Sequence, residues 1–184
     1  MNLYGFASGD PINFSDPFGL CPDDKNPKCV GKRDLTPQEG EKVLAAAVFF
    51  MDLMDAAGTT YHLQDGSQLD NTMDCSKFCT LSQSVLGQTE HVSTGWLSPS
   101  GGIASSEWFR PVPASEARAG DRIVQQGHMG IYAGVAVDAR GGTAYLAVDM
   151  GKRGPSQPYS WFGPGGHHPG GSAVTFYRPL LKAN

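Results

Sequence analysis

The chain has 184 residues, enough for one domain with a sizeable core, and its formal net charge is −4. It contains no basic cluster, which argues against a nucleic-acid partner, because proteins hold nucleic acids largely through phosphate contacts. It has no apolar run of membrane-spanning length and does not begin with a basic segment followed by an apolar one, so we expect neither stable membrane insertion nor a signal peptide.

Residues 1–20 contain two Asp-Pro steps and three glycines, a composition that favours turns. From the residues alone, this segment is an irregular leader or a disordered tail. Its motifs Asp-Pro-Ile-Asn (10–13) and Asp-Pro-Phe-Gly-Leu (16–20) resemble the ending of the Rhs-repeat core domain. That resemblance implies a shell-like carrier that is cut between Leu20 and Cys21 to release a toxin domain.

Three parts are therefore expected: the end of an Rhs core over 1–20, a linker over 21–35 and a toxin domain over 36–184. The linker is polar and contains prolines. Its cysteines, Cys21 and Cys29, form a disulfide only in an oxidising compartment, and the sequence leaves that pairing open. The four cysteines of the chain have no metal-binding CxxC spacing, so we expect no metal site, and no cofactor is implied.

The toxin domain opens with a strong helix start. Thr36 is placed as the N-cap, Pro37 as the first helical residue, and Glu39 completes a capping box. Apolar residues then recur at helical spacing to about Ala57, and Gly58 supplies the stop. A second helix is expected over 76–86, and Gly87 ends it.

The second half of the chain favours strands. Residues 88–118 and 151–171 are rich in glycine and proline, and we expect irregular structure and a loop there. The strands expected between and after these segments are 121–124, 128–134, 143–150 and 173–178. The expected fold class is α+β, with N-terminal helices packed on an antiparallel β-sheet.

Cys75 is the first candidate for chemistry. It follows Asp74 at the start of the second helix, where unpaired N–H groups and the helix dipole favour a thiolate. The simpler interpretation is a small buried residue. His128, at the start of an expected strand, is the histidine best placed to act as its base. His62 and His91 lie in polar connections where a solvated histidine is the default, and His167-His168 lies in the loop.

Asp149 is the candidate that would orient His128. It interrupts an apolar run over 145–148, and a carboxylate inside a core strand needs a partner. A hydrogen bond to His128 would supply one, as in other catalytic triads. The alternative is that Asp149 only marks the strand end, since Gly151 follows.

Three motifs resemble, in order, the signature of NlpC-type papain-like cell-wall peptidases. They are Asp-Cys-Ser-Lys-Phe (74–78), Ala-Gly-Asp-Arg-Ile (119–123) and His-Met-Gly-Ile-Tyr-Ala-Gly (128–134). The closing segment Phe-Tyr-Arg-Pro (176–179) is similar to that family's last strand. The resemblance implies a papain-like fold over roughly residues 58–180.

It also implies roles for individual residues. Cys75 is the nucleophile, His128 the base and Asp149 the orienting group, while Tyr61 and Ser76 contribute to substrate binding. Two positions depart from the family: Lys77 replaces a glycine, and Asp149 stands where a histidine is usual.

The implied function is an antibacterial toxin that hydrolyses amide bonds in the peptide stems of peptidoglycan. The implied partners are the Rhs carrier shell and a cognate immunity protein, and the implied location is the periplasm of a target bacterium. The same triad also suits a deamidase, transglutaminase or acyltransferase that acts on a cytosolic protein. A third hypothesis is a binding module in which Cys75 and Cys79 are ordinary residues of one helix face.

Overall fold

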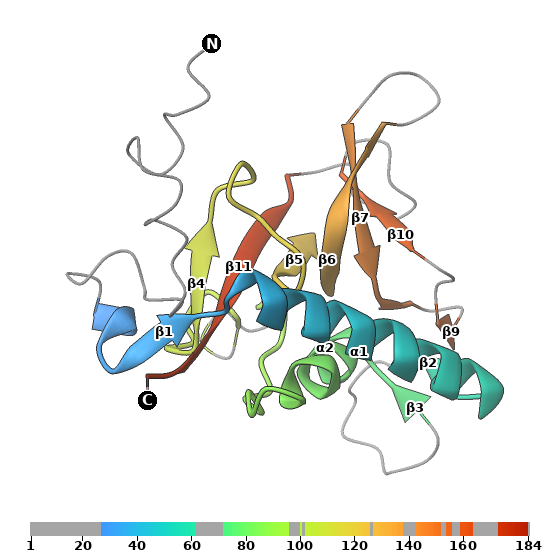
Figure 1. The fold of residues 1–184 in the computed structure, drawn as a ribbon. Coiled ribbons are helices and arrows are strands. Elements are labelled where there is room, and N and C mark those ends of the chain that lie inside the picture. Colours follow the sequence, from blue (N-terminus) through green and yellow to red (C-terminus); the bar gives the residue numbers. More distant parts are fainter. Residues whose placement is uncertain are drawn as a thin grey trace.

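The computed structural model describes residues 27–61, 72–95, 100, 102–125, 127–137, 143–151, 154–155, 159–163 and 173–183. Over these residues the fold is α+β: a curled antiparallel sheet of seven strands and two α-helices (Figure 1). This confirms the expected fold class. The helices are α1 (Pro37–Ala56) and α2 (Cys75–Ser84), with a short 3-10 helix, η2 (Pro27–Cys29), before them.

The strand order of the sheet is β1-β11-β5-β6-β7-β10, and β4 also pairs with β11. These strands are β1 (Lys32–Asp34), β4 (Phe109–Val112), β5 (Arg122–Gln125), β6 (His128–Val137), β7 (Thr143–Val148), β10 (Ser160–Phe162) and β11 (Thr175–Lys182). Two small pairs lie outside the sheet: β2 (Thr60–Tyr61) runs parallel to β3 (Thr72–Met73), and β8 (Met150–Gly151) runs antiparallel to β9 (Gly154–Pro155).

The strands expected from the sequence correspond to β5, β6, β7 and β11. The expectation of irregular structure over 88–118 was wrong for β4, and that of a loop over 151–171 was wrong for β8, β9 and β10. These strands have two to four residues each, too few to show an alternating pattern. Strands β4 and β10 form because the longer strands β11 and β7 offer them backbone partners, and β8 and β9 pair with each other. The local sequence does not reveal these pairings.

The start of α1 follows the expected capping box. The Thr36 N–H donates to Glu39 Oε2 at 2.8 Å, and the Glu39 N–H donates to Thr36 Oγ1 at 3.2 Å. Arg33 also donates two hydrogen bonds, of 2.7 and 2.8 Å, to the Glu39 carboxylate. These bonds lower the pKa of Glu39 from 4.5 to about 2. At the other end, Gly58 has a φ of 66°, which suits the left-handed residue that ends a helix.

One glycine contact docks α1 onto the sheet. A Cβ atom on Gly40 would lie 2.1 Å from the carbonyl oxygen of Ala119, so only glycine allows this approach. Gly120, beside Ala119, has a φ of 86°, and a Cβ atom on it would lie 2.6 Å from the Gly40 Cα. The first turn of α1 therefore packs backbone against backbone on the turn that precedes β5.

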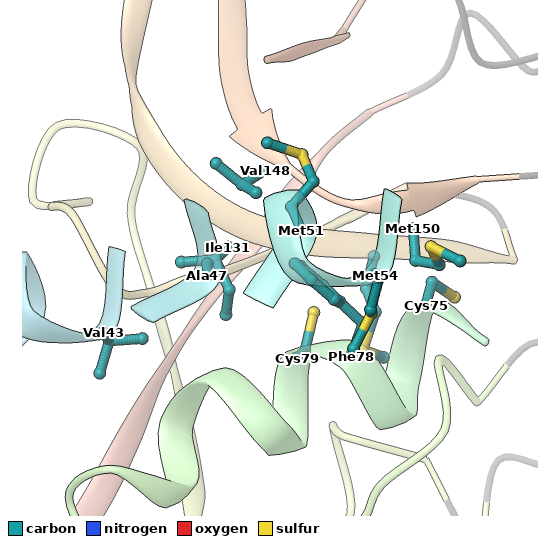
Figure 2. Close-up of a cluster of buried hydrophobic side chains, with 11 residues drawn as sticks. Val43, Ala47, Met51, Met54, Cys75, Phe78, Cys79, Ile131, Val148 and Met150 are labelled. Carbon is teal, nitrogen blue, oxygen red and sulfur yellow. The ribbon is translucent and has the colours of Figure 1, made fainter. Parts of the chain in front are cut away.

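The main core lies between the helices and the strands. Side chains from α1, α2, β6, β7 and β8 form one buried cluster, and Figure 2 shows Cys79 of α2 pointing toward α1 and Met54 of α1 pointing toward α2. Cys75 belongs to the same cluster. The core therefore holds the start of α2 against the strands that carry His128 and precede Asp149.

Buried ion pairs join β1 to the sheet. Asp34, 3% exposed, accepts from Arg110 Nε at 2.7 Å and from a second nitrogen of the same guanidinium. Arg178 also reaches Asp34, at 3.4 Å, and holds Asp121 with two bonds of 3.0 and 2.9 Å. Residues 32–34, at the end of the predicted linker, are thus part of the sheet. The domain boundaries themselves stay a prediction.

Candidate active site

The N-terminus of α2 places Cys75 against the start of β6. Asp74 is the N-cap and accepts a 2.7 Å hydrogen bond from the Lys77 N–H, so Cys75 is the first helical residue. The backbone N–H of Met129 donates to the Cys75 sulfur. The thiol is therefore one residue along β6 from His128. Cys75 is only 5% exposed.

Burial determines the charge state of this thiol. It raises the pKa of Cys75 from 9.0 to about 11; the Asp74 and Asp149 carboxylates add to the rise, and the Met129 N–H opposes it. That rise corresponds to about 3 kcal/mol, whereas a helix N-terminus contributes only ~0.3–1 kcal/mol. The expectation that the helix start makes the thiolate easier to form was therefore wrong in its net direction, because desolvation is the larger effect.

His128 and Asp149 form the second half of the site. Asp149 is fully buried directly after β7, and its Oδ2 is hydrogen-bonded to His128 Nε2. The imidazole also stacks on Phe162 of β10, with 5.7 Å between ring centroids and 16° between planes. A Cβ on Gly130 would lie 3.0 Å from the Asp149 Cβ, so glycine leaves room for the carboxylate. Asp149, directly after β7, and Phe162 of β10 thus fix the orientation of the His128 ring.

The contact with Asp149 also assigns the ring nitrogens. When His128 donates its Nε2 proton to the carboxylate, Nδ1 is the basic nitrogen of the neutral ring. Asp149 is close enough to Cys75 to influence the thiol pKa. The three residues expected to carry the chemistry therefore occupy one region, where α2, β6 and the end of β7 meet.

Ser76 takes part in a neighbouring hydrogen-bond chain. Its hydroxyl donates to Asp74 Oδ1 at 2.6 Å and accepts from His91 Nε2 at 2.9 Å. A nucleophilic serine instead donates its proton to the imidazole. The direction of these hydrogen bonds argues against a second nucleophile at Ser76. The bond from His91 also links that residue to the start of α2. His91 is exposed, as expected for a residue in a polar connection, but its ring also bonds Ser76, and partial burial lowers its pKa.

Several candidate residues lie outside the described residues. Leu20, Cys21, His62, His167 and His168 are all among them. The backbone of Tyr61 belongs to β2, but its side chain is not among the described parts. Cys29 is disulfide-bonded, whereas Cys75 and Cys79 are free thiols.

Sequence reasoning missed two residues around this site. Phe162 was placed in a loop, and only the pairing of β10 with β7 brings its ring to His128. Arg122 was given no role beyond its place in the expected strand 121–124 and in the second motif, yet it is completely buried beneath α2. No local pattern could have identified either residue, because both contacts depend on strand pairing.

The described part of the chain contains no group of three or more His, Cys, Asp or Glu side chains that could hold a metal ion. Among the same residues, no helix is long and apolar enough to cross a membrane. Comparison of the chain with protein-family models, curated proteins and solved structures finds no match. Arguments about function therefore depend on the motifs and on the geometry of the site.

Proposed function

We propose that this chain is a papain-like cysteine hydrolase of the NlpC type, which cleaves amide bonds in the peptide stems of peptidoglycan. The observation that carries the proposal is the arrangement at Cys75. A helix-start cysteine receives a hydrogen bond from the residue after His128, and His128 is bonded to the buried Asp149. The motifs that contain Cys75 and His128, with Ala-Gly-Asp-Arg-Ile (119–123) between them, follow one another in the order typical of the family.

The proposed reaction passes through a thioester. The Cys75 sulfur attacks the carbonyl carbon of the scissile amide while its proton moves to His128 Nδ1. The C–N bond then breaks and the imidazolium protonates the leaving amine. Water, deprotonated by His128, hydrolyses the thioester and restores the thiol. Asp149 holds the ring and stabilises the imidazolium, and the Cys75 N–H is an oxyanion donor worth roughly 3 kcal/mol.

The raised pKa of Cys75 determines how this reaction begins. With a pKa of about 11, the thiol remains protonated at neutral pH when no substrate is bound. Proton transfer to His128 then accompanies the attack and does not precede it as a stable ion pair. A resting thiol of this kind also reacts slowly with other electrophiles, because the thiolate is the nucleophile.

The biological setting is part of the proposal. The motifs over 10–20 support a toxin domain released from an Rhs carrier, and peptidoglycan stems are exposed in the periplasm of a target bacterium. A producer of such an enzyme needs a specific immunity protein that blocks the site.

Digestion of isolated sacculi tests the activity. The 184-residue chain should release stem-peptide fragments that mass spectrometry identifies, and Cys75→Ala should release none. Cys79→Ala is the matched control, since it removes a second buried thiol one helical turn away and should remain active. An active Cys75→Ala protein would exclude the mechanism.

Toxicity in different compartments tests the substrate. Export of the chain to the periplasm should kill a host bacterium, and cytosolic expression should not. Toxicity confined to the cytosol would instead indicate the alternative, a papain-like deamidase, transglutaminase or acyltransferase with a protein target.

A further inference from the structure

Arg122 differs from the other buried arginines of the described chain. Arg110 and Arg178 each meet carboxylates, at Asp34 and Asp121. Arg122 is 0% exposed, and the partners recorded for its guanidinium are neutral. Burying a cation without a carboxylate costs several kcal/mol, so this charge requires an explanation.

The neutral partners are arranged to accept from the guanidinium. Nε donates to Gln83 Oε1 at 2.8 Å, and the Gln83 amide is held in this orientation because its Nε2 donates to the Gly120 carbonyl. Nη2 donates to Thr80 Oγ1 at 3.2 Å, while the Thr80 hydroxyl donates its own proton to the Ser76 carbonyl. Helix α2 therefore presents oriented acceptors to Arg122.

Two further contacts hold the same group. Nη1 lies 3.7 Å from the Met129 sulfur, and the guanidinium carbon lies 4.4 Å above the centre of the Phe109 ring. A cation over an aromatic face is electrostatically stabilised. Burial lowers the pKa of Arg122 to about 10, so it remains protonated at neutral pH. The site therefore contains a permanent buried positive charge.

This charge acts on the candidate nucleophile. The titratable groups near the Cys75 thiol or the Arg122 guanidinium include Asp74, Cys79, Glu90, His91, His128 and Asp149. The Asp74 and Asp149 carboxylates raise the pKa of Cys75. Met129 links the two groups in space, because its sulfur lies 3.7 Å from Arg122 Nη1 and its N–H donates to the Cys75 sulfur. Negative charge at Cys79, Glu90 and Cys75, in that order, raises the pKa of Arg122, so the interaction between Arg122 and a thiolate at Cys75 is attractive.

We propose that Arg122 is a positioning residue whose buried charge stabilises the negative charge that forms at the Cys75 sulfur. The inference rests on the proposed role of Cys75 as nucleophile. The Arg122 guanidinium is fully buried beneath α2 and therefore does not touch the substrate. It offsets the Asp74 and Asp149 carboxylates, which would otherwise oppose attack.

The reaction of Cys75 with iodoacetamide tests this role without any substrate. In Arg122→Met, we expect the rate at Cys75, resolved by mass spectrometry, to fall about tenfold at mildly alkaline pH, equivalent to about one pKa unit. Its pH profile should move to higher pH. Arg122→Lys keeps the charge and should stay within about twofold of the wild type. Failure to digest peptidoglycan would leave these alkylation results unchanged.

Lys77→Met is the matched control. It removes the same formal charge two residues from Cys75, but from an exposed position where solvent screens it, so the rate should change by less than about twofold. Urea unfolding of Arg122→Met should show only a small loss of stability, because removing a buried cation offsets the loss of its hydrogen bonds to Gln83 and Thr80.

Two results would overturn the proposal. One is a folded Arg122→Met protein in which the pH profile of Cys75 alkylation is unchanged. The other is loss of folding in both Arg122→Met and Arg122→Gln, which would assign the guanidinium a structural role alone.

Discussion

At the scale of single residues, the site depends on a competition between burial and charge. The helix start and the Met129 N–H favour a thiolate at Cys75, and we propose that Arg122 does so too, while desolvation, Asp74 and Asp149 disfavour it. Desolvation is the largest of these effects. The residue identities and their order could be predicted from motifs. The direction of the pKa shift could not, because it depends on how deeply α2 buries its first residue.

Asp149→Asn separates the effect of the Asp149 carboxylate on His128 from its effect on the Cys75 thiol. We expect peptidoglycan hydrolysis to fall about 100-fold, because a neutral amide no longer stabilises the His128 imidazolium. The alkylation profile of Cys75 should move to lower pH, because one of the groups that raise its pKa is gone. Turbidity of a sacculus suspension and iodoacetamide rates measure these changes. Parallel loss of both signals would instead indicate that the variant is misfolded.

At the scale of elements, the sequence predicted features that depend on neighbouring residues and missed features that depend on residues far apart in the chain. The capping box at Thr36 and Glu39 identified the start of α1 because all its partners lie within four residues. Strand β4 contains Pro111 and is held by its pairing with β11, 64 or more residues away along the chain. Such a strand has no periodic pattern of its own. The same limit hid Arg122, whose acceptors lie on α2, 39 and 42 residues away.

Glu39→Gln tests the start of α1 through its pH dependence. The folded state lowers the pKa of Glu39 from 4.5 to about 2, so its contribution is complete above pH 4.5 and is lost as the pH falls toward 2. At neutral pH we expect a loss of about 1 kcal/mol in the free energy of unfolding. Near pH 2 wild type and variant should converge.

Urea unfolding across this range measures the difference. Glu41→Gln, an exposed position on the same helix, should track the wild type at every pH. A constant difference between Glu39→Gln and the wild type down to pH 2 would contradict the assignment.

At the scale of the whole molecule, the buried ion pairs connect distant parts of the chain. Asp34 on β1, Arg110 on β4, Asp121 before β5 and Arg178 on β11 form one network. A composition scan identifies the charges but not their burial. The sheet is therefore specified by contacts between residues as far as 144 positions apart.

Asp34→Asn should destabilise the fold by about 3 kcal/mol, because it leaves Arg110 buried without its carboxylate. Glu107→Gln supplies the matched control, since Glu107, which precedes β4, pairs with Lys32 of β1 through a side chain that is 72% exposed. That change should cost below about 1 kcal/mol. Equal losses in the two variants, measured by urea unfolding, would show that burial does not distinguish the pairs.

The pairing of β1 with β11 has a mechanical consequence. Lys32 lies opposite Lys182, so the two ends of the described chain leave the sheet at the same end of one antiparallel ladder. A force applied between these ends loads the hydrogen bonds one after another, as in the opening of a zipper, and not all at once in shear. The ladder should yield at low force through Lys32 and Arg33. Resistance should rise at Asp34, where the buried ion pairs with Arg110 and Arg178 must break together.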